Sequence, residues 1–114
     1  MTMTIYHNPR CSKSRQALQI LHDNGVEPEV MEYLKTPPDA AVLRNLIDKL
    51  NVPAHDVLRT KEDEYTVAGL SPQSSDAQII KAIQENPILL ERPIVVKGEK
   101  AVIGRPPEKV AELL

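Results

Sequence analysis

The chain has a single cysteine, Cys11, placed where a thiol can do chemistry. It follows the turn dipeptide Asn8-Pro9 and directly precedes a segment with helical periodicity. The first N–H groups of a helix have no partners within the helix, and the helix dipole adds partial positive charge there. That environment favours a thiolate and lowers the pKa of a cysteine. We therefore expect Cys11 to be a partly exposed nucleophile rather than a small buried apolar residue.

Polar residues surround this thiol in the sequence. Cys11-Ser12-Lys13-Ser14 has the spacing of a redox Cys-x-x-Cys motif with serine in the second position, so an external thiol must complete a redox cycle. Ser14 fits a catalytic role and a first-turn bond to the backbone equally well. His7 and Arg10 could add positive charge. Arg15 could contact a substrate, although a surface carboxylate is its favoured partner.

The composition excludes several classes of function. The net charge is −2 and the chain has no Phe or Trp, whereas nucleic-acid-binding proteins typically combine a basic surplus with stacking aromatics. His22 and His55 have no partners at metal-ligand spacing, and one cysteine permits no internal disulfide. No segment approaches the ~20 apolar residues of a membrane span, and no apolar signal region is present. We predict a soluble, monomeric, cytoplasmic protein that binds neither metal, membrane nor nucleic acid.

The elements around Cys11 follow a strand–helix–strand order. Residues 4–6 form a β-prone run, and apolar residues spaced three and four apart between 17 and 21 predict a helix. Asn24-Gly25 is typical of the end of such a helix. Residues 30–34 then predict a second strand. Short connections of this kind indicate a β-α-β unit with two parallel strands.

The middle of the chain is predicted to be helical. Thr36-Pro37-Pro38-Asp39 has the features of a helix start, with Thr36 as the N-cap and proline at the first helical position. Residues 53–74 are polar and irregular, with short helical turns expected around 57–58 and 65–70. Ser75 with Gln78 predicts the capped start of another helix, closed near 86–87. The apolar stripes of the two helices are Leu43, Leu46, Ile47 and Leu50, and Ile79, Ile80 and Ile83.

The end of the chain returns to strands. Residues 94–96 and 101–103 flank a four-residue segment that predicts a hairpin, Lys97-Gly98-Glu99-Lys100. A final helix is expected from Pro106 onward, with Val110, Leu113 and Leu114 on its apolar side. The complete order is that of an α/β protein with a thioredoxin-like fold and a central helical insertion. We expect a single domain over residues 1–114.

Four segments, in order along the chain, resemble the glutaredoxin-dependent arsenate reductase family. The segments are Tyr6-His-Asn-Pro-Arg-Cys11 with Ser14-Arg15, Leu58-Arg59 ahead of Tyr65, Leu90-Glu-Arg-Pro-Ile-Val-Val96, and Gly104-Arg-Pro-Pro-Glu108. The resemblance places Pro93 at the cis position of the thioredoxin fold, and we predict a cis Arg92-Pro93 bond. Ser12-Lys13 departs from the Gly-Thr of well-known members.

The resemblance implies an oxyanion site of three arginines, Arg59, Arg92 and Arg105, around the Cys11 thiolate. The chemistry agrees, because a thiolate and an oxyanion repel one another, and guanidinium groups offset both charges with paired hydrogen bonds. His7 resembles the family histidine that tunes the nucleophile. A strand-end histidine with a local hydrogen bond is an equally good interpretation of His7.

The reaction implied by the resemblance is the reduction of arsenate to arsenite, an arsenic detoxification. It proceeds through a covalent Cys11 adduct, with glutathione as co-substrate, glutaredoxin as partner and no bound cofactor. Two alternatives remain open. One is a reductase or binder of glutathione conjugates, and the other is a non-enzymatic regulator resembling the Spx-type proteins. Such regulators usually carry Cys-x-x-Cys, so Ser14 counts against the second alternative.

Overall fold

The computed structural model describes residues 3–114 of the chain, and Met1 and Thr2 lie outside the described residues. The chain divides into two compact units. The sheet unit comprises residues up to Thr36 together with Arg92–Leu114, and the helical unit comprises Pro37–Glu91. The expectation of one domain over residues 1–114 stays a prediction.

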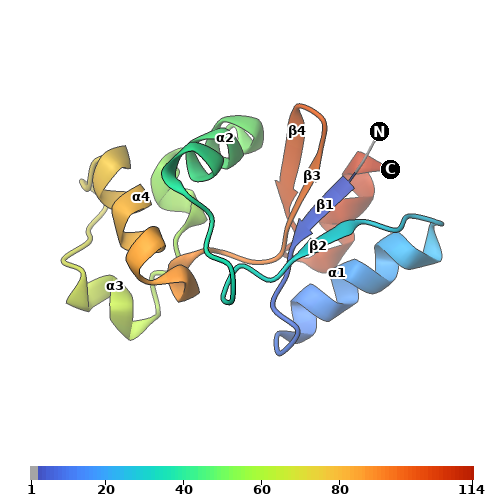
Figure 1. Ribbon diagram of the computed structural model, residues 1–114, viewed down its shortest axis with the longest axis horizontal. Coiled ribbons are helices and arrows are strands. Elements are labelled where there is room, and N and C mark those ends of the chain that lie inside the picture. The colour runs from blue at the N-terminus through green and yellow to red at the C-terminus, as the bar shows by residue number, and fades with distance from the viewer. Residues whose placement is uncertain (1–2) are drawn as a thin grey trace. The chain divides into compact units, whose positions relative to one another are not determined.

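The sheet unit contains a mixed four-stranded sheet of order β2-β1-β3-β4 (Figure 1). Its strands are β1 (Met3–Tyr6), β2 (Glu29–Met31), β3 (Ile94–Lys97) and β4 (Lys100–Ile103). The β1–β2 pair is parallel, and the β1–β3 and β3–β4 pairs are antiparallel. The predicted β-α-β unit, the hairpin and the thioredoxin-like fold are therefore confirmed.

The second strand is shorter than predicted. It ends at Met31 rather than Leu34, because the chain turns after Glu32. The carbonyl oxygen of Glu32 accepts hydrogen bonds from the N–H groups of Lys35 and Thr36, both at 3.0 Å. A backbone closed in this way cannot continue a strand ladder.

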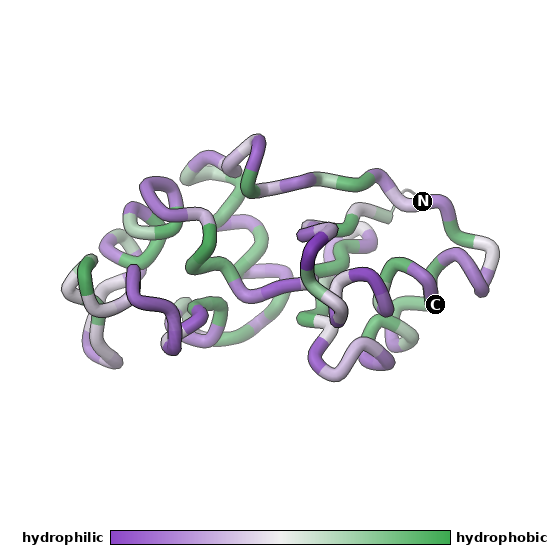
Figure 2. The backbone as a smooth tube through the Cα atoms, turned by 90° about the horizontal axis from the view of Figure 1, so that it is seen from below, coloured by the Kyte–Doolittle hydropathy of each residue, from purple (hydrophilic) through white to green (hydrophobic). Residues whose placement is uncertain are grey.

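Helix α1 (Ser12–Asp23) has Cys11 as its N-cap and Asn24 as its C-cap, in agreement with the predicted start and end. It packs against the C-terminal 3-10 helix η3 (Pro107–Leu113) in the same unit. The tube in Figure 2 alternates between hydrophobic and hydrophilic stretches along the helices. One face of the sheet and these two helices share an aliphatic core of Met3, Ile5, Ala17, Leu21, Val95, Val110 and Leu113.

The final helix differs from the prediction, because it is a 3-10 helix rather than an α-helix. Three residues per turn align side chains that lie three apart. Pro107, Val110 and Leu113 form this row and are buried. Leu114 falls outside the row and is 48% exposed, so its predicted place on the apolar side is wrong.

The helical unit contains α2 (Ala40–Leu50), η1 (Ala54–Val57), α3 (Asp63–Val67), α4 (Asp76–Glu85) and η2 (Pro87–Leu89). Helix α2 packs on α4. The predicted apolar stripes are buried, except that Leu50 at the end of α2 is half-buried. No helix within residues 3–114 is long and apolar enough to cross a membrane.

The start of α2 lies three residues beyond the predicted one. The N-cap is Asp39, whose carboxylate accepts the N–H of Val42 at 2.9 Å, and not Thr36. Thr36 and Pro37 each precede a proline, and a residue before proline is driven out of the helical region. The helix can therefore begin only after Pro38.

Candidate active site

Cys11 is the N-cap of α1 and is partly exposed, as predicted. Its own N–H donates to the carbonyl oxygen of Asn8 at 3.0 Å, which closes the turn before the helix. Burial raises the pKa of the Cys11 thiol, but hydrogen bonds from the Ser14 N–H, the Arg92 guanidinium and the Lys13 N–H outweigh it. The pKa therefore lies below its ordinary value, and the thiolate is stabilised.

His7 and Ser14 form a buried hydrogen-bonded pair next to Cys11. His7 Nδ1 and Ser14 Oγ are 2.6 Å apart, and the N–H of Asn8 donates to the same oxygen at 3.1 Å. Ser14 has no exposed surface, and His7 is 6% exposed. Ser14 thus makes the local backbone bond expected of a first-turn residue, and His7 makes the local bond expected at a strand end.

The charge of His7 follows from this burial. Burial lowers the pKa of His7, the charge of Glu32 raises it, and the charge of Arg15 lowers it, with a net lowering. His7 is therefore mainly neutral near pH 7, and it does not supply the positive charge that the sequence suggested. Its link to Cys11 runs through Ser14, whose N–H donates to the sulfur.

Arg92 is brought to the thiol from more than eighty positions away in the sequence. Its guanidinium lies within hydrogen-bonding reach of the Cys11 sulfur. The Arg92-Pro93 bond is cis, which confirms the prediction, and the Arg105-Pro106 bond is cis as well. Arg105 Nε donates to the Arg92 carbonyl oxygen at 2.8 Å. Of the two arginines predicted to converge, Arg92 thus reaches the sulfur, and Arg105 binds the main chain of Arg92.

The segments that carry these two arginines touch at Gly104. The N–H of Gly104 donates to the Pro93 carbonyl oxygen at 2.8 Å. A Cβ atom at Gly104 would lie 2.9 Å from Pro93 Cγ and 3.1 Å from Val110 Cγ1. Only glycine permits this close approach.

The remaining predicted arginines have other partners. Arg15 Nη1 donates to the Pro9 carbonyl oxygen at 2.8 Å, rather than to the carboxylate that was its favoured partner. This bond holds the turn before Cys11. Arg59 belongs to the helical unit, where its Nε donates to Glu62 Oε1 at 3.1 Å and its N–H to the Leu89 carbonyl oxygen. Its role at an oxyanion stays a prediction.

Sequence reasoning missed Tyr33, which had been assigned only to a strand. Tyr33 is fully buried, and it is one of the groups that influence the pKa of the Arg92 guanidinium. One signal could have found it. Tyr33 and Cys11 each follow one of two parallel strands, and the carboxyl ends of parallel strands share one edge of a sheet.

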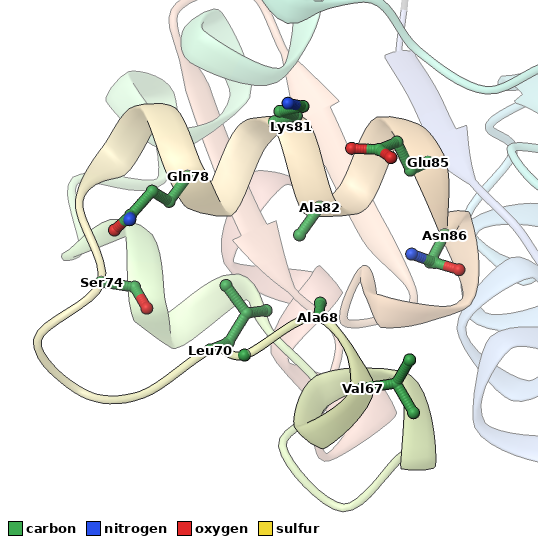
Figure 3. Close-up of a pocket in the computed structure, with 10 residues that line it drawn as sticks. Val67, Ala68, Leu70, Ser74, Gln78, Lys81, Ala82, Glu85 and Asn86 are labelled. Atoms are coloured by element: carbon green, nitrogen blue, oxygen red, sulfur yellow. The ribbon is translucent and has the colours of Figure 1, made fainter.

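In the described part of the chain, neither a metal site nor the hollow of the helical unit involves the predicted site residues. Among residues 3–114, no group of three or more His, Cys, Asp or Glu side chains could hold a metal ion. A hollow of about 380 Å³ lies in the helical unit between α4 and the segment from Val67 to Ser74 (Figure 3). Lys81 and Glu85 are its only charged lining residues. It contains none of the predicted site residues.

The fold and the thiol at a helix N-terminus define a thioredoxin-like protein with a stabilised thiolate. The chain belongs to the ArsC family, whose family model matches residues 6–113. It is 54% identical over 112 residues to the uncharacterised protein YfgD of Escherichia coli K12, with 96% of this chain and 94% of that protein covered. It is 45% identical to an arsenate reductase of Neisseria meningitidis, with 96% of each covered.

The structural comparison agrees with the sequence comparison. The arsenate reductase of Vibrio cholerae superposes with a TM-score of 0.96 at 43% identity, covering 100% of this chain and 98% of that one. The family that the sequence motifs resemble is therefore confirmed.

Proposed function

We propose that this protein is an arsenate reductase in which Cys11 is the nucleophile. The observation that carries the proposal is the thiol itself, half-buried at the N-terminus of α1 with the Arg92 guanidinium beside it. A lowered pKa of Cys11 gives a larger thiolate fraction at neutral pH, and the thiolate is the attacking species. Similarity to arsenate reductases over the full length supports arsenate as the oxyanion.

The substrate is bound by the N-terminus of α1 and by arginine side chains. The N-terminal N–H groups of α1 and the Arg92 guanidinium offset the negative charge of arsenate as it approaches the thiolate. Arg105 holds the main chain of Arg92 through its Nε and adds a second guanidinium close to this segment. The family resemblance implies Arg59 as a third arginine, and its part in binding stays a prediction.

The first chemical step forms the covalent adduct. The Cys11 thiolate attacks arsenic, a sulfur–arsenic bond forms, and one arsenic oxygen leaves as water after protonation. A glutathione thiol then attacks the Cys11 sulfur, and the sulfur–arsenic bond breaks with its electron pair remaining on arsenic. Two thiols are thereby oxidised to a Cys11–glutathione disulfide, arsenic passes from As(V) to As(III), and arsenite leaves. Glutaredoxin takes the glutathione from this mixed disulfide, and the Cys11 thiolate returns.

The external thiol is required because the site contains a single sulfur. Ser14 occupies the position of a resolving cysteine and cannot close a disulfide with Cys11. The electrons come from glutathione, so the proposal needs no bound flavin or nicotinamide. A reducing compartment such as the cytoplasm keeps Cys11 available as a thiol.

A coupled assay tests the proposal. Purified protein is mixed with arsenate, glutathione, glutaredoxin and glutathione reductase, and NADPH oxidation and arsenite are both measured. We expect arsenite to form at a rate proportional to the protein, and to require glutathione and glutaredoxin together. If the folded protein forms no arsenite in this assay, the proposal is overturned. Turnover of glutathione conjugates in the same preparation would then favour the alternative of a glutathione-handling protein.

A further inference from the structure

The main chain of Arg59 is held firmly within the helical unit. Its N–H donates to the Leu89 carbonyl oxygen at 2.8 Å, and the preceding residue, Leu58, forms an antiparallel β-bridge with Leu90. The Arg59 carbonyl oxygen accepts the Glu62 N–H at 3.2 Å, which closes a turn. The position of Arg59 is therefore fixed by its backbone, and what remains to be fixed is the direction of its side chain.

Glu62 stands at a position where its residue type is uncommon. It is the N-cap of the short helix α3, where Ser, Thr, Asp and Asn are preferred. Within residues 3–114 its side chain makes no capping hydrogen bond. Its Oε1 instead accepts a hydrogen bond from Arg59 Nε at 3.1 Å. The carboxylate is thus directed back to the arginine and not to the helix that begins after it.

The ion pair is partly sheltered from water. The side chains of Arg59 and Glu62 are 21% and 29% exposed, so solvent screens them less than it screens a surface pair. Arg59 Nη1 is buried and has no hydrogen-bond partner among residues 3–114. A buried charged donor without a partner is costly, and it is a natural donor to an anionic ligand. The guanidinium therefore has its Nε on a carboxylate and a terminal nitrogen left for an acceptor from outside the chain.

We propose that Glu62 is a positioning residue, which binds Arg59 through Nε and directs the terminal nitrogens of the guanidinium toward an oxyanion. The inference rests on the proposed function, in which Arg59 is the third arginine of the site. A planar guanidinium binds an oxyanion with paired hydrogen bonds, and a fork held in place loses less rotamer freedom on binding. Glu62 acts through Arg59, because a carboxylate in contact with an oxyanion would repel it.

Two opposing effects of Glu62 can be separated by substitution. The carboxylate orients Arg59, but its negative charge also repels an anion. Glu62→Gln keeps an acceptor oxygen for Arg59 Nε and removes the charge. Glu62→Ala removes both, so the guanidinium is released while the repulsion is also lost. A positioning role therefore predicts weaker oxyanion binding in Glu62→Ala, whereas simple neutralisation of Arg59 predicts stronger binding.

The experiment measures arsenate binding separately from turnover. Arsenate is titrated into Cys11→Ser protein, which cannot form the covalent adduct, and backbone and arginine Nε–H signals are followed by NMR. We expect the dissociation constant to rise about tenfold in Glu62→Ala, the effect of losing one hydrogen bond to a charged group. In Glu62→Gln it should stay within about twofold of the parent value, because the acceptor oxygen remains.

Asp63→Asn is the matched control. Asp63 is exposed and follows Glu62 directly, so the substitution removes the same charge without touching the pair. Arsenate binding should stay at the parent value. The Arg59 Nε–H signal, identified by its loss in Arg59→Ala, should shift in Glu62→Gln and stay in place in Asp63→Asn. A signal that does not move in Glu62→Gln would overturn the proposal, even if Glu62→Ala does not fold.

The remaining outcomes are equally decisive. An unchanged or lowered dissociation constant in folded Glu62→Ala would overturn the proposal. A further tenfold loss from Glu62→Ala in an Arg59→Ala background would do the same, because a positioning residue acts only through its partner. Arsenate binding that is absent, or that Arg59→Ala does not weaken, would show that Arg59 is no oxyanion ligand. If binding responds as expected but the parent protein does not reduce arsenate, the proposed function fails and the role of Glu62 stands.

Discussion

The first turns of α1 and α4 differ in how their unpaired backbone N–H groups are capped. At the start of α4, Ser75 Oγ accepts the Gln78 N–H at 3.2 Å and Gln78 Oε1 accepts the Ser75 N–H at 2.7 Å, a complete capping box. Asp76 adds a negative charge to that first turn. At the start of α1, Cys11 makes no side-chain capping hydrogen bond of this kind, and the first turn contains no acidic residue.

The difference separates a helix start used for stability from one used for chemistry. Two N–H groups at the start of α4 are satisfied by the capping box, and such a cap contributes about 0.5–2 kcal/mol. Those of α1 are directed at a sulfur whose charge state they change. The helix dipole that an aspartate neutralises at α4 is thus left at α1 for a thiolate and an incoming anion. Substitutions at four positions and one pH dependence test this contrast.

The largest effect is expected at Cys11 itself. Cys11→Ser removes the nucleophile, and a hydroxyl is not ionised near pH 7, so arsenate reduction should fall below detection. The thermal melting temperature should change little, because the side chain is partly exposed and serine is a good N-cap. The coupled assay and a thermal melt of the same preparation check both expectations. Residual activity at a tenth of the parent rate would show that another group attacks arsenic.

Arg92 is expected to have the second-largest effect. Arg92→Ala removes a charged donor at the thiolate and should lower kcat/KM about a hundredfold, as loss of one preorganised donor does. Arg92→Lys restores the charge without the planar fork and should recover only part of the rate. Steady-state kinetics on both variants measure the two losses. Full recovery by lysine would mean that charge alone matters.

Ser14 is the buried hydrogen-bond partner of His7 and Asn8 next to the thiol. Its replacement should lower both the stability and the rate. Ser14→Ala leaves His7 Nδ1 and the Asn8 N–H without their buried partner. Leaving buried polar groups unpaired costs about 1–3 kcal/mol of unfolding free energy. Urea denaturation gives this value. Ser14→Thr, which keeps the hydroxyl, is the matched control and should lose less.

Ser75→Ala is the counterpart at α4. It removes one half of the capping box and should lower the free energy of unfolding by about 1 kcal/mol. The rate of arsenate reduction should stay at the parent value. Ser75→Ala should thus lower stability without changing the rate, whereas Cys11→Ser should abolish the rate with little change in stability. A large rate loss in Ser75→Ala would contradict the separation.

The smallest effect is the dependence of stability on pH. The pKa of Cys11 is lower in the folded than in the unfolded chain, so the thiolate contributes stability that is complete above the unfolded value and is lost as the pH falls through the folded pKa. The melting temperature of the parent relative to Cys11→Ser should therefore rise as the pH increases from the folded pKa toward the ordinary cysteine value. A difference that stays constant over this range would mean that the thiol pKa is not shifted.

Much of the fold could be predicted because its signals are local. The Ser75–Gln78 cap, the Asn24-Gly25 helix end and the hairpin turn each depend on a few neighbouring residues. The start of α2 was misplaced because two consecutive prolines override the capping preference of Thr36. The end of β2 was misplaced because a backbone turn, and not side-chain pattern, decides it.

The site was predictable to the extent that its residues occur in motifs. Cys11 and Arg92 were found because each lies beside a proline-marked turn with a family resemblance, and the structure brings them together. Tyr33 was missed because a buried tyrosine next to a strand is indistinguishable from a core residue in one dimension. The partner of Arg15 was missed because it is a backbone carbonyl, that of Pro9 six residues earlier, rather than a carboxylate.

Gly104 fixes the spacing of the two segments that carry Arg92 and Arg105. The separation of the two arginine-bearing segments is set by van der Waals contact at Pro93, where a Cβ would lie at 2.9 Å, and by the hydrogen bond from the Gly104 N–H to the Pro93 carbonyl oxygen. Contact distances of this kind are stiff in compression, whereas arginine side chains are compliant. The spacing of the main-chain segments that carry Arg92 and Arg105 is therefore a property of the backbone rather than of the arginine side chains.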